Sequence, residues 1–114
     1  MSVKLNTRQV GDVSVVDVAG RITLGEGSSV IRDALKEMVG KGQKKILLNL
    51  GEVSYIDSSG IGELVSGFTS VTNSGGQLKL LNLNKRVKDL LQITKLYTVF
   101  DVHDDEAGAV RSFA

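Results

Sequence analysis

The sequence predicts an α/β fold with a small mixed β-sheet, which starts with an antiparallel hairpin, is otherwise largely parallel and is covered by about four helices. Two observations carry this prediction. Short apolar runs of extended type alternate with stretches whose apolar residues recur at helical spacing, which is typical of parallel strands joined by right-handed crossovers. The first two runs are instead separated by Gly11 and Asp12 alone, which favours a tight antiparallel hairpin.

The first half of the chain supplies the hairpin, one helix and the central strand. Residues 3–10 and 13–18 form the predicted antiparallel pair. A helix is expected over 28–41, because apolar and charged residues there fall on opposite sides and glycines follow. Residues 45–50 are almost continuously apolar, so they predict a central strand that is covered on both faces.

The second half continues the same alternation. A helix is expected over 58–74 and a buried strand over 78–83. Asn84 is the predicted N-cap of a third helix, residues 99–102 form the last predicted strand, and Asp104 is expected to cap a C-terminal helix. This order of elements completes the predicted sheet.

Length and composition limit the possible functions. We expect one domain over 1–114, because 114 residues suffice for a single core and no stretch looks like a linker. Lys and Arg number fourteen against thirteen Asp and Glu, so a net charge of +1 offers no field to attract nucleic acid or an anionic membrane. The absence of Cys and the single His argue against disulfides, thiolate chemistry and most zinc sites. We therefore expect a cytoplasmic protein without a metal or cofactor.

Two local patterns have plain structural interpretations. Gly25, Glu26 and Gly27 lie between a strand and a helix, as in dinucleotide-binding loops, but Val30 stands where that motif needs a third glycine. We interpret the stretch as a flexible connection. The densest basic patch lacks interleaved aromatic residues for base stacking, so a solvated helix face is expected. This patch consists of Lys85, Arg86 and Lys88.

His103 has acidic neighbours, which raises the question of a metal site. Asp101, Asp104 and Asp105 flank it, but the cluster supplies one nitrogen ligand and lacks the glycine and terminal glutamate of a calcium loop. Helix capping, with Glu106 in the first turn, explains the same carboxylates through the helix dipole. We predict a capped helix there and no metal.

The informative segment is 55–62, Tyr-Ile-Asp-Ser-Ser-Gly-Ile-Gly, where a buried strand leads into the second helix. Ser58 and Ser59 fall at the helix N-terminus, where unpaired N–H groups and the positive end of the dipole accept negative charge, including a phosphoryl group. Simple capping by Asp57 or Ser58 explains one of these polar residues, although one cap does not need three.

Helical geometry separates the two serines. At roughly 100° per residue, Ser59 lies about 160° from Ile61 at the centre of the apolar stripe, whereas Ser58 lies about 60° from it. We therefore predict that Ser58 caps the helix and that Ser59 faces outward with a free hydroxyl. The same count gives Ser59 three outward-facing neighbours and three flanking glycines that permit close approach by a partner. These residues are Glu63, Ser66, Ser70, Gly60, Gly62 and Gly67.

Ser59 could also be the nucleophile of an enzyme. The nucleophile-elbow pattern needs glycine two residues before the serine, and Asp57 occupies that position. His103 is about forty residues away and has no catalytic signature around it. The residues therefore favour a serine that another protein modifies.

Two segments resemble the hallmark motifs of STAS domains, specifically those of bacterial anti-sigma-factor antagonists. They are 57–61, Asp-Ser-Ser-Gly-Ile, and 20–22, Gly-Arg-Ile, which precedes the first helix. The resemblance covers essentially the whole chain, because length, order of elements and placement of both motifs agree with that family. It implies a small mixed sheet backed by helices, as the pattern of apolar residues also predicts.

The resemblance further implies a phosphorylation switch. In such antagonists, a partner that is both an anti-sigma factor and an ATP-dependent serine kinase phosphorylates the second serine of the motif, which is Ser59 here. The unmodified form binds that kinase and frees the sigma factor, and a PP2C-type phosphatase resets the switch. Many members have an acidic residue where this chain has Thr23. The predicted partner-binding residues are Arg21, Thr23, Asp57, Ser58, Ser59, Gly60, Gly62, Glu63 and Ser66.

Our hypothesis from the sequence is a non-enzymatic, cytoplasmic antagonist, monomeric when free, that loses its kinase partner when Ser59 is phosphorylated. Two alternatives remain open. One is a scaffold or accessory subunit of a stress-signalling or membrane transport complex, and the other is a small serine-dependent or nucleotide-binding enzyme. Ser59→Ala distinguishes them: the antagonist should stay bound to its partner, the enzyme should lose turnover, and the scaffold should be unaffected.

Overall fold

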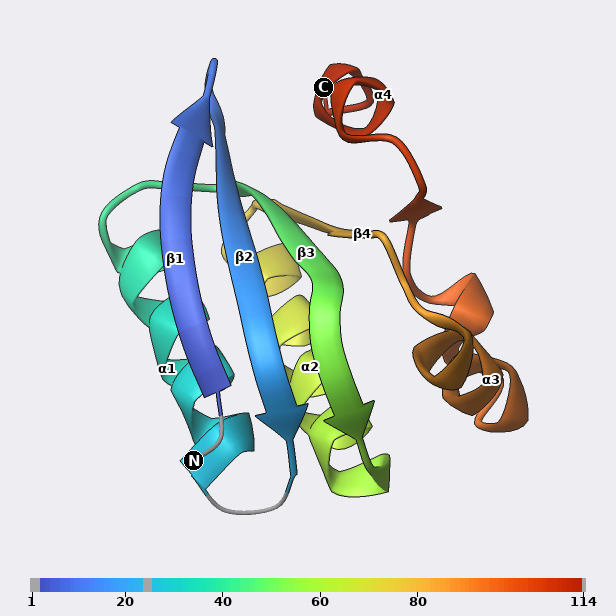
Figure 1. Ribbon diagram of the computed structural model, residues 1–114. Coiled ribbons are helices and arrows are strands. Elements are labelled where there is room, and N and C mark those ends of the chain that lie inside the picture. The colour runs from blue at the N-terminus through green and yellow to red at the C-terminus, as the bar shows by residue number, and fades with distance from the viewer. Residues whose placement is uncertain (1–2, 24–25, 114) are drawn as a thin grey trace.

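The computed structural model describes residues 3–23 and 26–113, and for 26–28 it describes the backbone alone. In chain order the elements are β1 (Val3–Val10), β2 (Val13–Ile22), α1 (Glu26–Gly40), β3 (Lys45–Ile56), α2 (Ser58–Asn73), β4 (Gln77–Leu81), α3 (Lys85–Ile93), a 3₁₀ turn (Leu96–Thr98), β5 (Val102–His103) and α4 (Glu106–Arg111). The strands form one sheet in the order β1-β2-β3-β4-β5 (Figure 1). β1 and β2 are antiparallel and the remaining neighbours are parallel, which confirms the predicted fold class.

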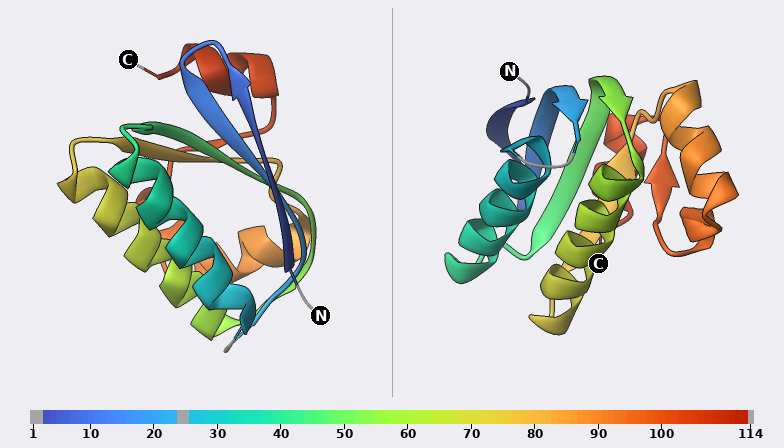
Figure 2. Two further views of the ribbon diagram at one scale, coloured as in Figure 1. Left: turned by 90° about the vertical axis from the view of Figure 1, so that its left-hand side faces the viewer. Right: turned by 90° about the horizontal axis from the view of Figure 1, so that it is seen from below.

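The two faces of the sheet are covered unequally. α1 and α2 lie side by side on one face, whereas α4 lies on the opposite face near the β1–β2 hairpin (Figures 1 and 2). The larger core lies between the sheet and α1 and α2, and includes Ile46, Leu48 and Leu64. The smaller core lies under α4 and consists of Val13, Val15, Leu47, Leu81 and Ala109. This alternation along β3 confirms the prediction of a central strand that is covered on both faces.

The α1–α2 contact depends on a missing side chain. A Cβ on Gly67 of α2 would lie 2.5 Å from Leu35 Cδ1 of α1, which is closer than carbon atoms pack. Gly67 is buried, although the helical count places it beside an outward face. The two helices therefore approach closely at this point.

Most predicted elements differ from the structure by one or two residues at an end, and three strands differ by more. β2 and β3 continue to Ile22 and Ile56, so both reach further toward the start of their following helices than expected. The last strand is Val102–His103 alone, because Lys95 takes a left-handed φ of 62° and leads into the 3₁₀ turn, which Val99 ends. The prediction of a strand over 99–102 was therefore wrong for residues 99–101.

The C-terminal helix is capped one residue later than predicted. Asp105, not Asp104, is the N-cap of α4, and its Oδ2 accepts a hydrogen bond from the Gly108 N–H at 2.7 Å. His103 Nε2 lies 3.1 Å from Asp101 Oδ2. No helix among the described residues is long and apolar enough to cross a membrane.

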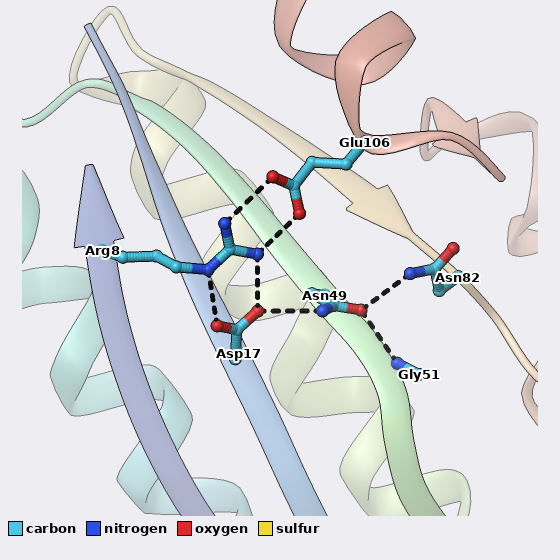
Figure 3. A network of polar contacts seen from close by, with 6 residues as sticks. All are labelled: Arg8, Asp17, Asn49, Gly51, Asn82 and Glu106. Atoms are coloured by element: carbon cyan, nitrogen blue, oxygen red, sulfur yellow. Dashed lines mark hydrogen bonds and ion pairs between the residues drawn. The ribbon is translucent and has the colours of Figure 1, made fainter. Parts of the chain in front are cut away.

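A polar network anchors α4 to the sheet (Figure 3). Arg8 donates to both carboxylate oxygens of Asp17, at 2.7 and 3.1 Å, and to both of Glu106, at 2.9 and 2.6 Å. Asn49 Nδ2 also donates to Asp17, at 2.8 Å. The bonds from Arg8 lower the pKa of both carboxyls, and the bonds to Glu106 and Asp17 raise the pKa of Arg8. All three side chains are therefore held charged and in fixed positions.

Candidate functional site

The candidate site lies where the parallel strands β2 and β3 end and α2 begins. Ile22 and Ile56 are register partners with buried side chains, so the ends of the two strands are held together. The Asp57 N–H donates to the Ile22 carbonyl at 3.3 Å. Asp57 is extended, at φ −106° and ψ −178°, and its Oδ1 accepts from the Gly60 N–H at 2.8 Å. Asp57 is therefore the N-cap of α2, and the prediction that Ser58 fills this role was wrong.

Both serines of the motif are exposed. The predicted exposure of Ser59 is confirmed, but Ser58 is exposed as well. The angular count misjudged Ser58 because it assumed a preceding turn of helix against which the side chain would lie. Ser58 is the first residue of α2, so no helical turn precedes it. Ser59 is the second residue and likewise has no preceding helical turn.

The three glycines that were predicted to border Ser59 differ in role. Gly60 is buried, and a Cβ there would collide with the Ile22 carbonyl oxygen and lie 2.8 Å from Ile56 Cγ1. Gly67 is buried against Leu35, as described above. Gly62 alone of the three is exposed, with open space where a Cβ would be. Gly60 and Gly67 therefore serve packing, and of the three glycines Gly62 alone leaves the open surface predicted beside Ser59.

The predicted outward residues of α2 are partly confirmed. Ser66 is exposed, whereas Glu63 and Ser70 are half-buried. Glu63 Oε1 lies 3.4 Å from Nη1 of Arg32, which comes from α1. The Ser70 carbonyl accepts a hydrogen bond from the Ser74 hydroxyl at 3.0 Å. The exposed surface around Ser59 is thus made by Ser58, Gly62 and Ser66, with Glu63 at its border.

Arg21 lies near the end of β2 and Thr23 directly follows that strand, beside the start of α2. Thr23 is half-buried and Arg21 is exposed. Arg21 is the register partner of Tyr55, and its guanidinium carbon lies 5.0 Å from the centre of the Tyr55 ring. The guanidinium of Arg86 from α3 lies 4.3 Å from the same centre. Sequence analysis missed this Arg21–Tyr55–Arg86 cluster, because contacts between a strand and a distant helix leave no local pattern.

The remaining candidates from the sequence lie apart from this end of the sheet or have ordinary roles. In the basic patch, Lys85 pairs with Asp89 at 2.9 Å and Lys88 lies 3.9 Å from Asp104. The Lys85–Asp89 hydrogen bond raises the pKa of Lys85. Gly25 of the glycine-rich stretch lies outside the described residues.

The electrostatics of the site favour added negative charge. The α-helical pattern leaves the N–H groups of Ser58 and Ser59 without intrahelical acceptors, and the positive end of the helix dipole lies there. α2 has no acidic residue in its first turn. The first turn can therefore accept an anionic group attached to Ser59, with Asp57 as the nearest carboxylate along the chain.

Comparison with known proteins agrees with this geometry. The model of the STAS domain family matches residues 4–109, which is nearly the whole chain. The chain belongs to the STAS domain family. The anti-sigma-B factor antagonist of Bacillus subtilis is 32% identical over 111 residues, which cover 97% of this chain and 100% of that protein.

Two solved structures share this fold. The Thermotoga maritima protein TM1081 is 26% identical, with a TM-score of 0.84 over 96% of this chain and 93% of that one. The phosphorylated form of the Bacillus cell fate determinant SpoIIAA is 20% identical, with a TM-score of 0.73 over 95% of this chain and 97% of that one. At this lower identity the second likeness concerns the fold.

In this STAS domain the two sequence motifs meet at one place. The Gly-Arg-Ile segment ends β2, the Asp-Ser-Ser-Gly segment starts α2, and the hydrogen bond between Asp57 and Ile22 joins them. Ser59 is therefore exposed at a corner that both motifs build.

Proposed function

We propose that this protein is an anti-sigma factor antagonist whose binding to an anti-sigma factor serine kinase is abolished when Ser59 is phosphorylated. The observation that carries the proposal is the exposed Ser59 in the first turn of α2, which holds no acidic residue. The 32% identity to an anti-sigma-B factor antagonist supports the same function. ATP is the phosphoryl donor, so the proposed setting is the cytoplasm.

The proposed reaction is phosphoryl transfer, with this protein as substrate and not as catalyst. The Ser59 Oγ attacks the γ-phosphorus of ATP, a new O–P bond forms, the bond to the bridging oxygen breaks, and ADP leaves. The hydroxyl proton passes to a base of the kinase. A PP2C-type phosphatase reverses the modification by hydrolysis, which restores the serine and releases inorganic phosphate.

The switch acts on affinity and leaves the fold intact. A phosphoserine carries about −1.5 to −2 charges, which the start of α2 can accept. The same charge is costly to remove from water against a partner surface that fits a neutral hydroxyl. Inverting a 99:1 preference takes about 5.5 kcal/mol, which lost hydrogen bonds and desolvation of the phosphate can supply together.

The proposed docking surface follows the exposed residues around Ser59. Ser58, Gly62 and Ser66 extend it along α2, and Arg21 and Thr23 extend it across the end of β2. Asp57 and Gly60 act by fixing the first turn, and Glu63 borders the surface. We propose that the free protein binds as a monomer and that residues 1–114 act as one domain.

A kinase assay tests the proposal directly. The protein is incubated with ATP and candidate anti-sigma factor kinases, and the modified peptide is identified by mass spectrometry. Wild type and the matched control Ser58→Ala should both gain one phosphate on the peptide that contains residue 59, and Ser59→Ala should gain none. Phosphate on Ser58, Ser66 or Ser70 in place of Ser59 would contradict the proposal.

A binding measurement with the same kinase completes the test. Ser59→Ala should bind in the presence and absence of ATP, whereas wild type should dissociate once ATP is added. Thr69→Ala serves as the control, since it removes an exposed hydroxyl of α2 outside the proposed docking surface, and it should behave as wild type. Equal dissociation of the Ser59→Ala protein would show that another group carries the switch.

A further inference from the structure

Arg32 of α1 has unused hydrogen-bonding capacity beside the face of α2 that carries Ser59. Its Nη1 lies 3.4 Å from Glu63 Oε1, and its Nε lies 3.7 Å from Asp33 Oδ1, which is beyond hydrogen-bond distance. Among the buried side-chain nitrogen and oxygen atoms of the described residues, Arg32 Nε alone has no hydrogen-bond partner. A buried donor without an acceptor costs stability, so this guanidinium is held in a position that its present partners do not fully satisfy.

The geometry of α2 places Ser59 close to the same guanidinium. Ser59 and Glu63 are four residues apart, so they are neighbours on one helix face, with Cβ atoms about 5 to 6 Å apart. Side chains in a helix lean toward its N-terminus and cover the preceding turn. Because Glu63 shares a helix face with Ser59, the Arg32 guanidinium that contacts Glu63 lies on the side of α2 that carries Ser59.

The packing of the two helices keeps Arg32 in reach. α1 and α2 lie side by side along their length (Figure 2), and Gly67 lets them approach closely at Leu35. On α1, Leu35 follows Arg32 by three residues, and on α2, Gly67 follows Glu63 by four residues. The Arg32–Glu63 pair and the Leu35–Gly67 contact thus lie on neighbouring turns of one interface.

We propose that Arg32 receives the phosphate of phosphorylated Ser59 within the same molecule, taking its guanidinium from Glu63. This inference rests on the proposed phosphorylation of Ser59. A phosphate dianion offers more charge and more acceptor oxygens than a carboxylate, and a guanidinium binds such a group through paired N–H donors. The unpaired Nε gains an acceptor, and Glu63, now next to a like charge, turns toward water.

The consequence is a second change at the docking surface. Phosphorylation adds charge at Ser59 and at the same time rearranges the ion pair that links α1 to α2. A partner that reads the unmodified surface therefore loses both the neutral hydroxyl and the original position of Glu63. The phosphate, held in cis, is also less available to a cation of the partner.

The test uses protein in which phosphoserine is installed at position 59 during synthesis, so that no kinase is needed. The second ionisation of the phosphate is followed by ³¹P NMR during a pH titration in wild type, Arg32→Gln and Glu63→Gln. Arg32→Gln should raise this pKa by roughly half a unit to one unit, because the facing cation is lost while Asp57 and Glu63 remain. Glu63→Gln should lower it, because a like charge is removed and Arg32 is freed.

Lys36→Gln is the matched control, since it removes one positive charge from an exposed position one turn further along α1. An equal rise of the phosphate pKa in Lys36→Gln and Arg32→Gln would overturn the proposal. A second readout does not depend on substitution: the NMR signal of the Arg32 Nε–H should shift on phosphorylation in wild type. An unchanged signal would also overturn it.

Failure of this inference and failure of the proposed function give different results. If no kinase modifies Ser59, the proposed function fails, while the synthetic phosphoprotein still reports on Arg32. If the kinase modifies Ser59 and the titrations show no role for Arg32, the proposed function stands and the intramolecular contact fails.

Discussion

The N-termini of α2 and α4 have the same type of cap, but only α4 has an acidic residue in its first turn. Each helix follows an aspartate whose side chain accepts from the N–H of a glycine three residues later, at 2.8 Å in α2 and 2.7 Å in α4. α4 then has Glu106 in its first turn, whereas α2 has Ser58 and Ser59 and no acidic residue there. The two turns therefore differ in whether the negative charge that favours a helix start is already present.

This difference shows how one local motif serves two purposes. In α4 the charge is permanent, and Arg8 ties it to Asp17 on the sheet (Figure 3). In α2 the equivalent charge has to be added by an enzyme, under the function proposed here. The start of α4 thus fixes the helix to the sheet, whereas the start of α2 is where, under the proposed function, a phosphate is added and removed.

Alanine substitution of Gly60 and Gly108, which donate to the two N-cap aspartates, should give the largest difference in stability between the two helix starts. Gly60→Ala should destabilise the fold by about 3 kcal/mol, because its Cβ would collide with the Ile22 carbonyl and with Ile56. Gly108→Ala should change stability by less than about 1 kcal/mol, since its Cβ meets Asp105 Oδ2 at 3.0 Å and alanine favours the helix. Urea denaturation of both variants measures this, and equal losses would mean that the two turns are packed alike.

Removal of Arg8 should give the next largest effect, through α4. Arg8→Ala should cost about 2 kcal/mol at neutral pH, because Asp17 and Glu106 lose their shared donor, although all three side chains are roughly one-third exposed, which weakens the pair. Circular dichroism during urea unfolding measures the loss. An unchanged urea midpoint would show that the network does not contribute to stability.

The same variant has a defined pH dependence. Hydrogen bonds from Arg8 lower the pKa of Asp17 and of Glu106 in the folded protein. This stabilisation is therefore complete above the ordinary pKa of these groups, near pH 4, and is lost as the pH falls through their lowered values. The stability difference between wild type and Arg8→Ala should shrink below about pH 4. A constant difference down to pH 2 would contradict the assignment.

Periodicity predicted most of the fold because core-facing residues carry it. The hairpin at Gly11, the buried central strand and the helix after Asn84 all follow from apolar spacing and cap chemistry that act within a few residues. The short last strand was overestimated for a related reason. Local preference favours a strand at Val99, but the left-handed Lys95 and the following 3₁₀ turn decide the chain path.

The details of the site were less predictable because they depend on contacts between distant segments. Glycine has no side chain, so the sequence could not show that Gly60 lies against Ile22 or that Gly67 lies against Leu35. Ion pairs between distant residues leave no local sequence pattern either: Arg32 and Glu63 are 31 residues apart, and Arg8 and Glu106 are 98 apart. The exposure of Ser59, by contrast, was predicted correctly, although its place in the first turn accounts for it as well as the angular count does.

The caps themselves should contribute equally at both helices. Asp57→Ala and Asp105→Ala should each cost about 1 kcal/mol, because each removes a hydrogen bond to an N–H that has no intrahelical partner. Asp57→Asn and Asp105→Asn should recover most of the loss, since asparagine caps about as well. Thermal unfolding of the four variants measures this. A much larger loss at Asp57 would show that its carboxylate has a role beyond capping.

Ser59→Asp should have the smallest effect on stability and a large one on partner binding. A carboxylate in the first turn gains about 0.3 to 1 kcal/mol from the helix dipole, and it loses about 0.2 to 0.5 kcal/mol by facing Glu63 four residues later. The melting temperature should therefore stay within a few degrees of wild type.

Ser66→Asp, in the middle of α2, is the control for an added charge away from the helix N-terminus. If Ser59→Asp destabilised the protein as much as Arg8→Ala does, the start of α2 would have a structural role like that of α4, and phosphorylation there would act by weakening the fold. A stable Ser59→Asp protein that no longer binds its partner would show that the added charge is read at the surface.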